Sequence, residues 1–190
     1  PSIRITHMKN RAFGLSRRLA RDRRGATAVE FAIVAPVFLA LVFSILEAGY
    51  FFFVTSAVDQ AAARAARVIR TGQAQSATTP ISRAEFFDKV CEVVDLFGNC
   101  NTQLTVDVAR YSSFAELAAD ATAPTCRDAD DDAVNAIPYS PGAERDIVRV
   151  RICYLHKSFN PALGLNLAQA ADGSRKVISV TIFRNEPFNS

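Results

Sequence analysis

The hydrophobic positions of this 190-residue sequence form one long run near the N-terminus and shorter periodic patterns after it. From Phe31 to Leu46 every residue is apolar or small except Ser44, and the apolar character resumes after Glu47. About 20 mostly apolar residues cross a bilayer core of roughly 30 Å as a helix. The stretch from about Val29 to Val54 therefore predicts a transmembrane helix. A buried helix of a soluble domain is the alternative, but such helices are usually shorter and carry a polar stripe.

The helical pattern continues beyond this run. Residues 55–69 contain no Gly or Pro, and Ala recurs at every fourth position along one face, at Ala57, Ala61 and Ala65. Small residues at this spacing allow another helix to approach closely, although Ala also has a high helix propensity of its own. The arginines of the segment, Arg64, Arg67 and Arg70, are expected to face water. Gly72 and the polar residues up to Pro80 predict the end of the helix and a linker.

A second helix is predicted after the linker, because the sequence there contains a capping box. In Ser82-Arg83-Ala84-Glu85 the Ser hydroxyl and the Glu carboxylate can satisfy free amides of the first turn. Apolar residues then recur at helical spacing, at Phe86, Phe87, Val90, Val93, Val94 and Phe97. Gly98 supplies the C-terminal stop. We expect this apolar stripe to pack on a sheet.

Three later segments alternate apolar and polar residues with period two: Thr102 to Arg110, Asp146 to His156, and Arg175 to Phe183. Polar partners such as Arg149 and Arg151 indicate an antiparallel sheet covered on one face. Residues 113–116 match a capping box and predict a short helix, whereas residues 121–144 and 160–164 are expected to be exposed loops. The predicted fold class is α+β, a long N-terminal transmembrane helix followed by a small head with a helix packed on an antiparallel β-sheet.

The charge distribution predicts which end of the transmembrane helix lies in the cytoplasm. Residues 1–25 hold 8 of the 22 Lys and Arg but only 1 of the 19 acids, net +7, which leaves net −4 for the remainder. Because positive charge stays on the cytoplasmic side, the tail is predicted to be cytoplasmic and the head to be across the membrane. A cleaved secretory signal fits less well, since its apolar region is shorter and ends in an Ala-x-Ala-like site. The single Met8 leaves a start at that position as an alternative to Pro1.

The translocated side of a membrane is usually oxidising, which changes the interpretation of the four cysteines. An even number in such a domain predicts disulfides. Of the three possible pairings we favour Cys91 with Cys100 and Cys126 with Cys153, because the first pair would join a helix end to the chain that leaves it. Four free thiols are the alternative. The short Cys-x-x-Cys or Cys/His spacing of a zinc site is missing.

The border between the basic tail and the apolar run reads Arg23-Arg24-Gly25-Ala26-Thr27-Ala28-Val29-Glu30-Phe31. A basic leader, a Gly, four small or apolar residues, Glu and an aromatic, followed by a long apolar helix, resembles the processing site of type IV prepilins. Together with Pro36, Glu47-Ala48-Gly49 and the closing residues 183–188, it resembles the TadE-like minor pilins (pseudopilins) of the tight-adherence (Tad) pilus system. The resemblance covers the N-terminal third; the rest agrees only in the order of elements.

The resemblance implies that a membrane prepilin peptidase cuts after Gly25 and leaves Ala26 as the mature N-terminus, with Glu30 and Phe31 used in processing and assembly. Glu30 would neutralise the freed amino group of a neighbouring subunit, since a carboxylate in a membrane helix is costly without a partner. The alternative is that Glu30 lies at the headgroup boundary. Glu47 is expected at the opposite interface, with an ion pair to a partner helix as the less favoured alternative.

The chemistry of an enzyme is missing from the sequence. There is no nucleophile motif, phosphate-binding Gly loop or paired His ligands, so no catalytic residue, cofactor or small-molecule substrate is predicted. His156 is expected to be solvated or bonded to a loop at a strand end. The cluster of acidic residues around Asp128 could supply oxygen ligands for calcium. Ala133 and Tyr139 do not fit the EF-hand pattern, so no metal is predicted. A calcium-binding loop of another type is the alternative. The acidic head argues against nucleic acid.

The sequence therefore predicts a minor pilin with a leader (1–25), a transmembrane and stem helix (26–75) and a periplasmic head (76–190). Its expected location is the inner membrane, with the N-terminus cytoplasmic, and its expected partners are a prepilin peptidase and other major and minor pilins. An uncleaved single-pass anchor that presents a periplasmic binding module is the main alternative. A membrane-tethered periplasmic hydrolase is the third.

Overall fold

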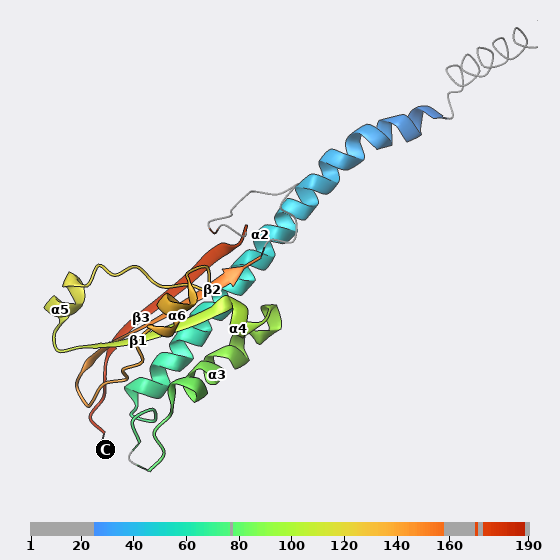
Figure 1. Ribbon diagram of the computed structural model, residues 1–190. Helices are drawn as coiled ribbons and strands as arrows, with labels where there is room; N and C mark the ends of the chain where they lie inside the picture. Colours follow the sequence, from blue (N-terminus) through green and yellow to red (C-terminus); the bar gives the residue numbers. More distant parts are fainter. Residues whose placement is uncertain (1–24, 77, 158–169, 171–172, 189–190) are drawn as a thin grey trace, which may run out of the picture. The chain divides into compact units, whose positions relative to one another are not determined.

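The computed structural model describes residues 25–76, 78–157, 170 and 173–188 (Figure 1). The predicted leader up to residue 24 and the predicted loop at 160–164 lie outside these residues. The chain divides into two compact units, residues 1–45 and 46–190, which are described separately below. Helix α2 (Ala26–Arg70) contributes to both units.

The first unit consists, in its described part, of the start of α2. The helix continues through Pro36, and none of its residues up to Ile45 is buried. Phe31, Val37 and Ile33 are each more than two-thirds exposed. Among the described residues α2 is the one helix long and apolar enough to cross a membrane.

The second unit is built on a three-stranded antiparallel sheet. Its strands are β1 (Leu104–Tyr111), β2 (Ile147–His156) and β3 (Arg175–Arg184), in the spatial order β1-β2-β3. Val108 faces Val150 across the first pair, and Arg151 faces Val180 across the second. The sequence prediction of three antiparallel strands is confirmed, with each strand boundary within two residues of its expected place.

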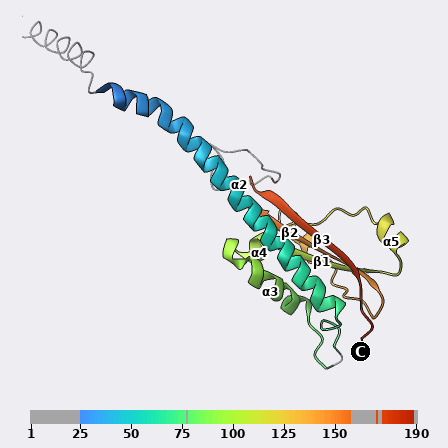
Figure 2. The ribbon, with the colours of Figure 1, turned by 180° about the vertical axis from the view of Figure 1, so that it is seen from behind.

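Two helices cover one face of the sheet, where the sequence predicted one. Figures 1 and 2 show the C-terminal part of α2 lying beside α3 (Arg83–Val94) against the strands. The two helices share a core with the sheet in which Val58, Ile69, Phe86, Leu104 and Val150 are almost fully buried. Ala57, Ala61 and Ala65 are buried in this unit too. The Ala stripe therefore packs within the head itself, and the predicted linker separates two elements of one core.

The second helix forms where the capping box predicts it. Ser82 Oγ accepts a hydrogen bond from the Glu85 amide at 3.2 Å, and a Glu85 carboxylate oxygen accepts one from the Ser82 amide at 2.8 Å. A short 3₁₀ turn, η2 (Asp95–Phe97), follows and leads through Gly98 to α4 (Cys100–Gln103). Gly98 has φ +155°, and a Cβ there would meet the Gln103 side chain at 2.0 Å, so the bend requires glycine.

The expectation of a sheet covered on one face is wrong for β1 and β2, because the chain after β1 crosses their opposite face. At β3 this face stays open, since Ile178, Val180 and Ile182 are exposed. Every residue of β2 is buried. Helix α5 (Phe114–Ala119), N-capped by Ser113 as predicted, leads into residues 120–126, and Thr105 Oγ1 donates to the Thr125 carbonyl at 2.6 Å.

The predicted exposed loop at 121–144 is also wrong over much of its length. It contains α6 (Asp131–Asn135), and Cys126, Val134 and Ile137 within it are buried. Residues 138–140 bond to the free edge of β1: the Val108 amide donates to Pro138 O at 3.1 Å, and the Ser140 amide donates to Val108 O at 2.8 Å. An edge strand leaves its amides and carbonyls unpaired, and this segment satisfies two of them.

Candidate functional site

The residues of the predicted processing site lie together at the start of α2. Ala26 is the first α-helical residue, and Gly25, Ala26, Glu30 and Phe31 are all exposed. Glu30 makes no ion pair with another described residue. At the helical rise of about 1.5 Å per residue, it lies roughly 6 Å along the axis from Ala26.

The fold does not require glycine at position 25. A Cβ built there would have no heavy atom within 4 Å, and the residue is not in the left-handed region of φ. At Gly98, by contrast, a Cβ would clash.

Glu47 and His156 lie close together inside the second unit, which corrects the expectation that His156 is solvated or bonded to a loop. Glu47 lies on the first turn of α2 in this unit, and its carboxylate is 3.9 Å from Nε2 of His156. His156 is 5% exposed and lies against the rings of Tyr50 and Phe51. The histidine is therefore buried, not solvated, and Glu47 faces the head of its own chain. Desolvation lowers the pKa of His156, against the opposing effect of Glu47.

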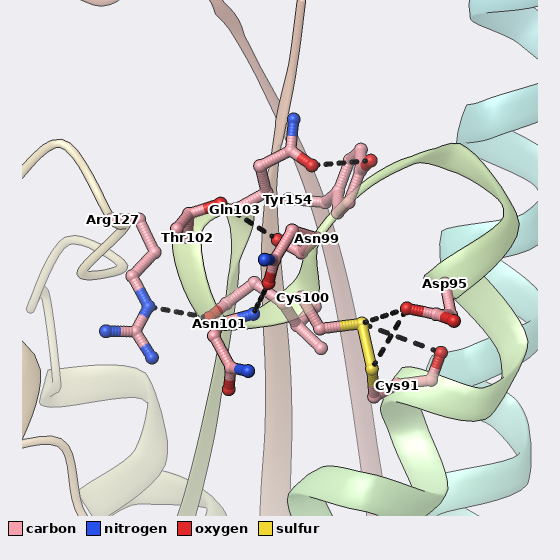
Figure 3. Close-up of a disulfide and its surroundings, with 10 residues drawn as sticks. Cys91, Asp95, Asn99, Cys100, Asn101, Thr102, Gln103, Arg127 and Tyr154 are labelled. Carbon is pink, nitrogen blue, oxygen red and sulfur yellow. Dashed lines mark hydrogen bonds between the residues drawn. A yellow bond between two sulfur atoms is a disulfide. The ribbon is translucent and has the colours of Figure 1, made fainter.

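The first disulfide joins Cys91 on α3 to Cys100 at the start of α4 (Figure 3). It closes the turn that contains η2. The disulfide therefore joins the end of α3 to the chain that leaves it, as the sequence predicted. Asp95 lies 3.9 and 4.0 Å from the two sulfurs. These three residues are the single group of potential metal ligands found among the described residues, and the disulfide leaves neither sulfur as a thiolate.

The second disulfide joins Cys126 to Cys153 on β2. It fixes the crossing segment to the second face of the sheet, beside the buried Leu155. The structure thus contains the favoured pairing of the four cysteines, and none of them is a free thiol.

A buried ionic cluster lies on the same face, and sequence reasoning missed it. The Arg151 Nε atom donates to Asp107 at 2.6 Å, and Arg149 pairs with Asp120 at 2.9 Å. Tyr111 donates a hydrogen bond to Asp120, and burial, followed by this bond, raises the pKa of Tyr111 to about 12. Side-chain and backbone hydrogen bonds lower the pKa of Asp120.

A signal for this cluster was present in the sequence. Asp107 occupies a polar position of one predicted strand, and Arg149 and Arg151 occupy polar positions of another. Opposite charges at such positions stabilise cross-strand pairs. The three residues join the crossing segment to the sheet, which is a structural role.

The acidic residues around Asp128 do not converge on one point in the structure. Asp128 pairs with Lys176 on β3 at 2.6 Å. Asp130 caps α6 by accepting a hydrogen bond from the Ala133 amide at 2.9 Å. These contacts give two of the acids a local function in holding the 120–137 segment.

The fold and the site define a class of protein: a small α+β head on a long, apolar N-terminal helix with a glycine and a glutamate at its start. Residues 25–67 of the chain match the family model described as TadE-like protein, so this part of the molecule is TadE-like and the resemblance is confirmed. No curated protein and no solved structure matches the chain.

Proposed function

We propose that this chain is a minor pilin of a tight-adherence pilus, processed by a prepilin peptidase after Gly25. The observation that carries the proposal is the coincidence of the TadE-like match with the start of α2: the match begins at residue 25 and the helix at Ala26. Cleavage after Gly25 would remove the basic leader and leave a chain that begins at the first residue of the helix.

The exposure of Gly25 supports this proposal. A peptidase needs an accessible, unhindered backbone at the bond that it cuts, and Gly25 and Ala26 are exposed with small side chains. Since the fold leaves open space around Gly25, a requirement of the peptidase explains the glycine better than a requirement of the helix does.

The helix is proposed to cross the inner membrane over a shorter length than the sequence indicates. Tyr50, Phe51 and Val54 pack into the head, so they do not face lipid. Residues 26–46 are sufficient, because 21 helical residues extend about 31 Å. The part of α2 that packs against the head then begins at Glu47, whose carboxylate faces His156. The basic tail, by the positive-inside rule, would be cytoplasmic and the head periplasmic.

The proposed organisation has three parts: a leader (1–25), a transmembrane and stem helix (26–75) and a head (76–190). The stem from Leu46 onward is part of the head's core, so the head and the C-terminal part of α2 form one compact unit. The proposed partners are the prepilin peptidase and other major and minor pilins. The proposed work of the protein is packing between helices and heads, with no cofactor and no substrate.

Substitution of Glu30 tests this function. In a strain that lacks the gene, Glu30→Gln should fail to restore surface pili while the protein still reaches the membrane, because the uncharged amide cannot neutralise a freed amino group. The matched control is Asp59→Asn, which also removes one exposed carboxylate from α2. Electron microscopy counts the pili. Normal numbers with Glu30→Gln would contradict the proposed role of Glu30.

A further inference from the structure

The C-terminal part of α2 exposes a strip of arginines to solvent. Arg64, Arg67 and Arg70 recur at every third residue, on the side of the helix opposite its buried alanines. Residues 60–70 contain no acid. Arg70 lies 3.2 Å from Glu186, whereas Arg64 and Arg67 make no ion pair with any residue that the structure describes. We define these three arginines as the basic strip.

The neighbouring helix α3 and its C-cap expose acids in place of arginines. Glu85, Asp88, Glu92 and Asp95 follow each other at intervals of three or four residues, and all four are exposed. They lie opposite the buried apolar stripe of the same helix. Lys89 is the one cation between Glu85 and Asp95, so four acids and one Lys leave net −3. We define these four acids as the acidic strip.

The two strips lie side by side and face the same way. Phe97, just beyond α3, contacts Phe53 of α2, with 5.3 Å between the ring centres. Just before α3, the Ile81 amide donates to the carbonyl of Ala74, beyond the end of α2, at 3.1 Å. Helix α3 therefore runs antiparallel beside α2 (Figures 1 and 2). Both helices pack on the same face of the sheet, so both strips point away from it. No ion pair within the described part of the chain joins the strips, so their charges are available to a partner.

A surface with opposite charges on its two halves is complementary to itself. Rotation by 180° about an axis that lies between the two helices and parallel to them would place the basic strip of each copy on the acidic strip of the other. A partner of one charge would match only one of the strips. Phe53, which is 58% exposed where α2 meets η2, would lie near this axis and pack against its counterpart. Charge complementarity therefore favours a second copy of this chain as the partner.

We infer that the two strips together form the interface of a symmetric dimer of this chain. All of these residues belong to the second unit, so the interface is independent of cleavage after Gly25 and goes beyond the proposed function. Exposed ion pairs are individually weak and are screened by salt. The dimer should therefore be in equilibrium with the monomer and dissociate as the ionic strength rises.

The test measures association between two copies of the full chain that carry different affinity tags and are co-expressed and extracted in a mild detergent. The quantity measured is the fraction of one tagged copy that purifies with the other. Three double variants are compared with the wild type: Arg64→Glu with Arg67→Glu in the basic strip, Asp88→Lys with Glu92→Lys in the acidic strip, and Asp132→Lys with Glu144→Lys as the matched control. The control changes the net charge as the acidic-strip variant does, at two exposed acids outside both strips.

The inference predicts that the wild type and the control associate with themselves, and that self-association of each strip variant falls about tenfold or more, because like charges then face each other. A copy of the basic-strip variant should recover association with a copy of the acidic-strip variant, because their strips are again opposite in charge. Self-association of the strip variants at the wild-type level would overturn the inference, as would an equal loss in the control or failure of the mixed pair to recover. If wild-type copies do not associate with each other, the inference is also wrong.

Discussion

The buried side chain of Asp107 forms ion pairs that stabilise the head. It is 5% exposed and pairs with Arg149 and Arg151, which are also buried. Removal of one member of a buried ion pair leaves an uncompensated charge in a region of low dielectric constant, where charges are strongly penalised. The stability of the second face of the sheet therefore depends on this carboxylate.

We expect Asp107→Asn to lower the free energy of unfolding by about 3–5 kcal/mol. The matched control is Glu186→Gln, which removes a carboxylate from the exposed pair with Arg70 and should cost no more than about 1 kcal/mol. Urea denaturation of both variants measures the difference. Equal, small losses would show that the buried cluster contributes no more than a surface pair.

His156 gives the head a predicted dependence on pH. Because burial holds its pKa below 6.5, the unfolded state takes up a proton before the folded state as the pH falls. Stability from this group is fully present above about pH 6.5 and decreases as the pH falls toward the lower folded value. The groups that face it are Glu47, which raises the pKa, and Arg175, which lowers it.

The measurement is the thermal midpoint at about pH 7.5 and about pH 5.5, on either side of the ordinary histidine value. The wild type should lose more stability over this interval than His156→Gln, which cannot titrate there. The quantity compared is the change in thermal midpoint between the two pH values, which is the slope of stability with pH. The absolute midpoint is not compared, because the substitution itself changes packing against Tyr50 and Phe51. An identical slope in the two proteins would contradict the assignment.

At the scale of elements, the two disulfides close loops of different length. Cys91 and Cys100 are 9 residues apart, whereas Cys126 and Cys153 are 27 apart. A disulfide stabilises mainly by restricting the unfolded chain, and the effect grows with the length of the closed loop.

Replacement of both cysteines of a pair by Ser should therefore cost about 3 kcal/mol for the shorter loop and about 1 kcal/mol more for the longer one. Denaturant titration under oxidising conditions compares the two double variants with the wild type. A larger loss from the Cys91 and Cys100 variant would show that local packing, not loop entropy, determines their contributions.

The elements that the sequence predicted correctly are those with strong local signals. The capping box at Ser82 and the period-two alternation around Val108 and Val150 each depend on neighbouring residues, and both elements formed where expected. The apolar run likewise predicted α2, although not the residue at which α2 enters the head.

The errors concern long-range contacts. Local patterns do not reveal that residues 120–126 return to the sheet, so the polar positions of Arg149 and Arg151 indicated a sheet covered on one face only. Nor do they reveal that the Ala stripe of α2 meets its own sheet, or that His156 packs beside Glu47. Each of these contacts joins segments far apart in the sequence, and none has a short motif.

At the scale of the molecule, the TadE-like part and the head share one helix. The match covers residues 25–67, and α2 extends to Arg70 inside the core of the second unit. The start of α2 and the part of α2 in the core of the head are therefore segments of one continuous helix. The proposed function depends most directly on processing after Gly25.

The N-terminal sequence and intact mass of the protein from membranes, with and without a co-expressed prepilin peptidase, test this claim most directly. Gly25→Ala is the companion variant, because a Cβ at that position meets nothing in the fold and should impair cleavage without unfolding the helix. The account predicts a peptidase-dependent start at Ala26 in the wild type and a reduced fraction of it in Gly25→Ala. An unchanged N-terminus in both samples would contradict it and favour an uncleaved membrane anchor.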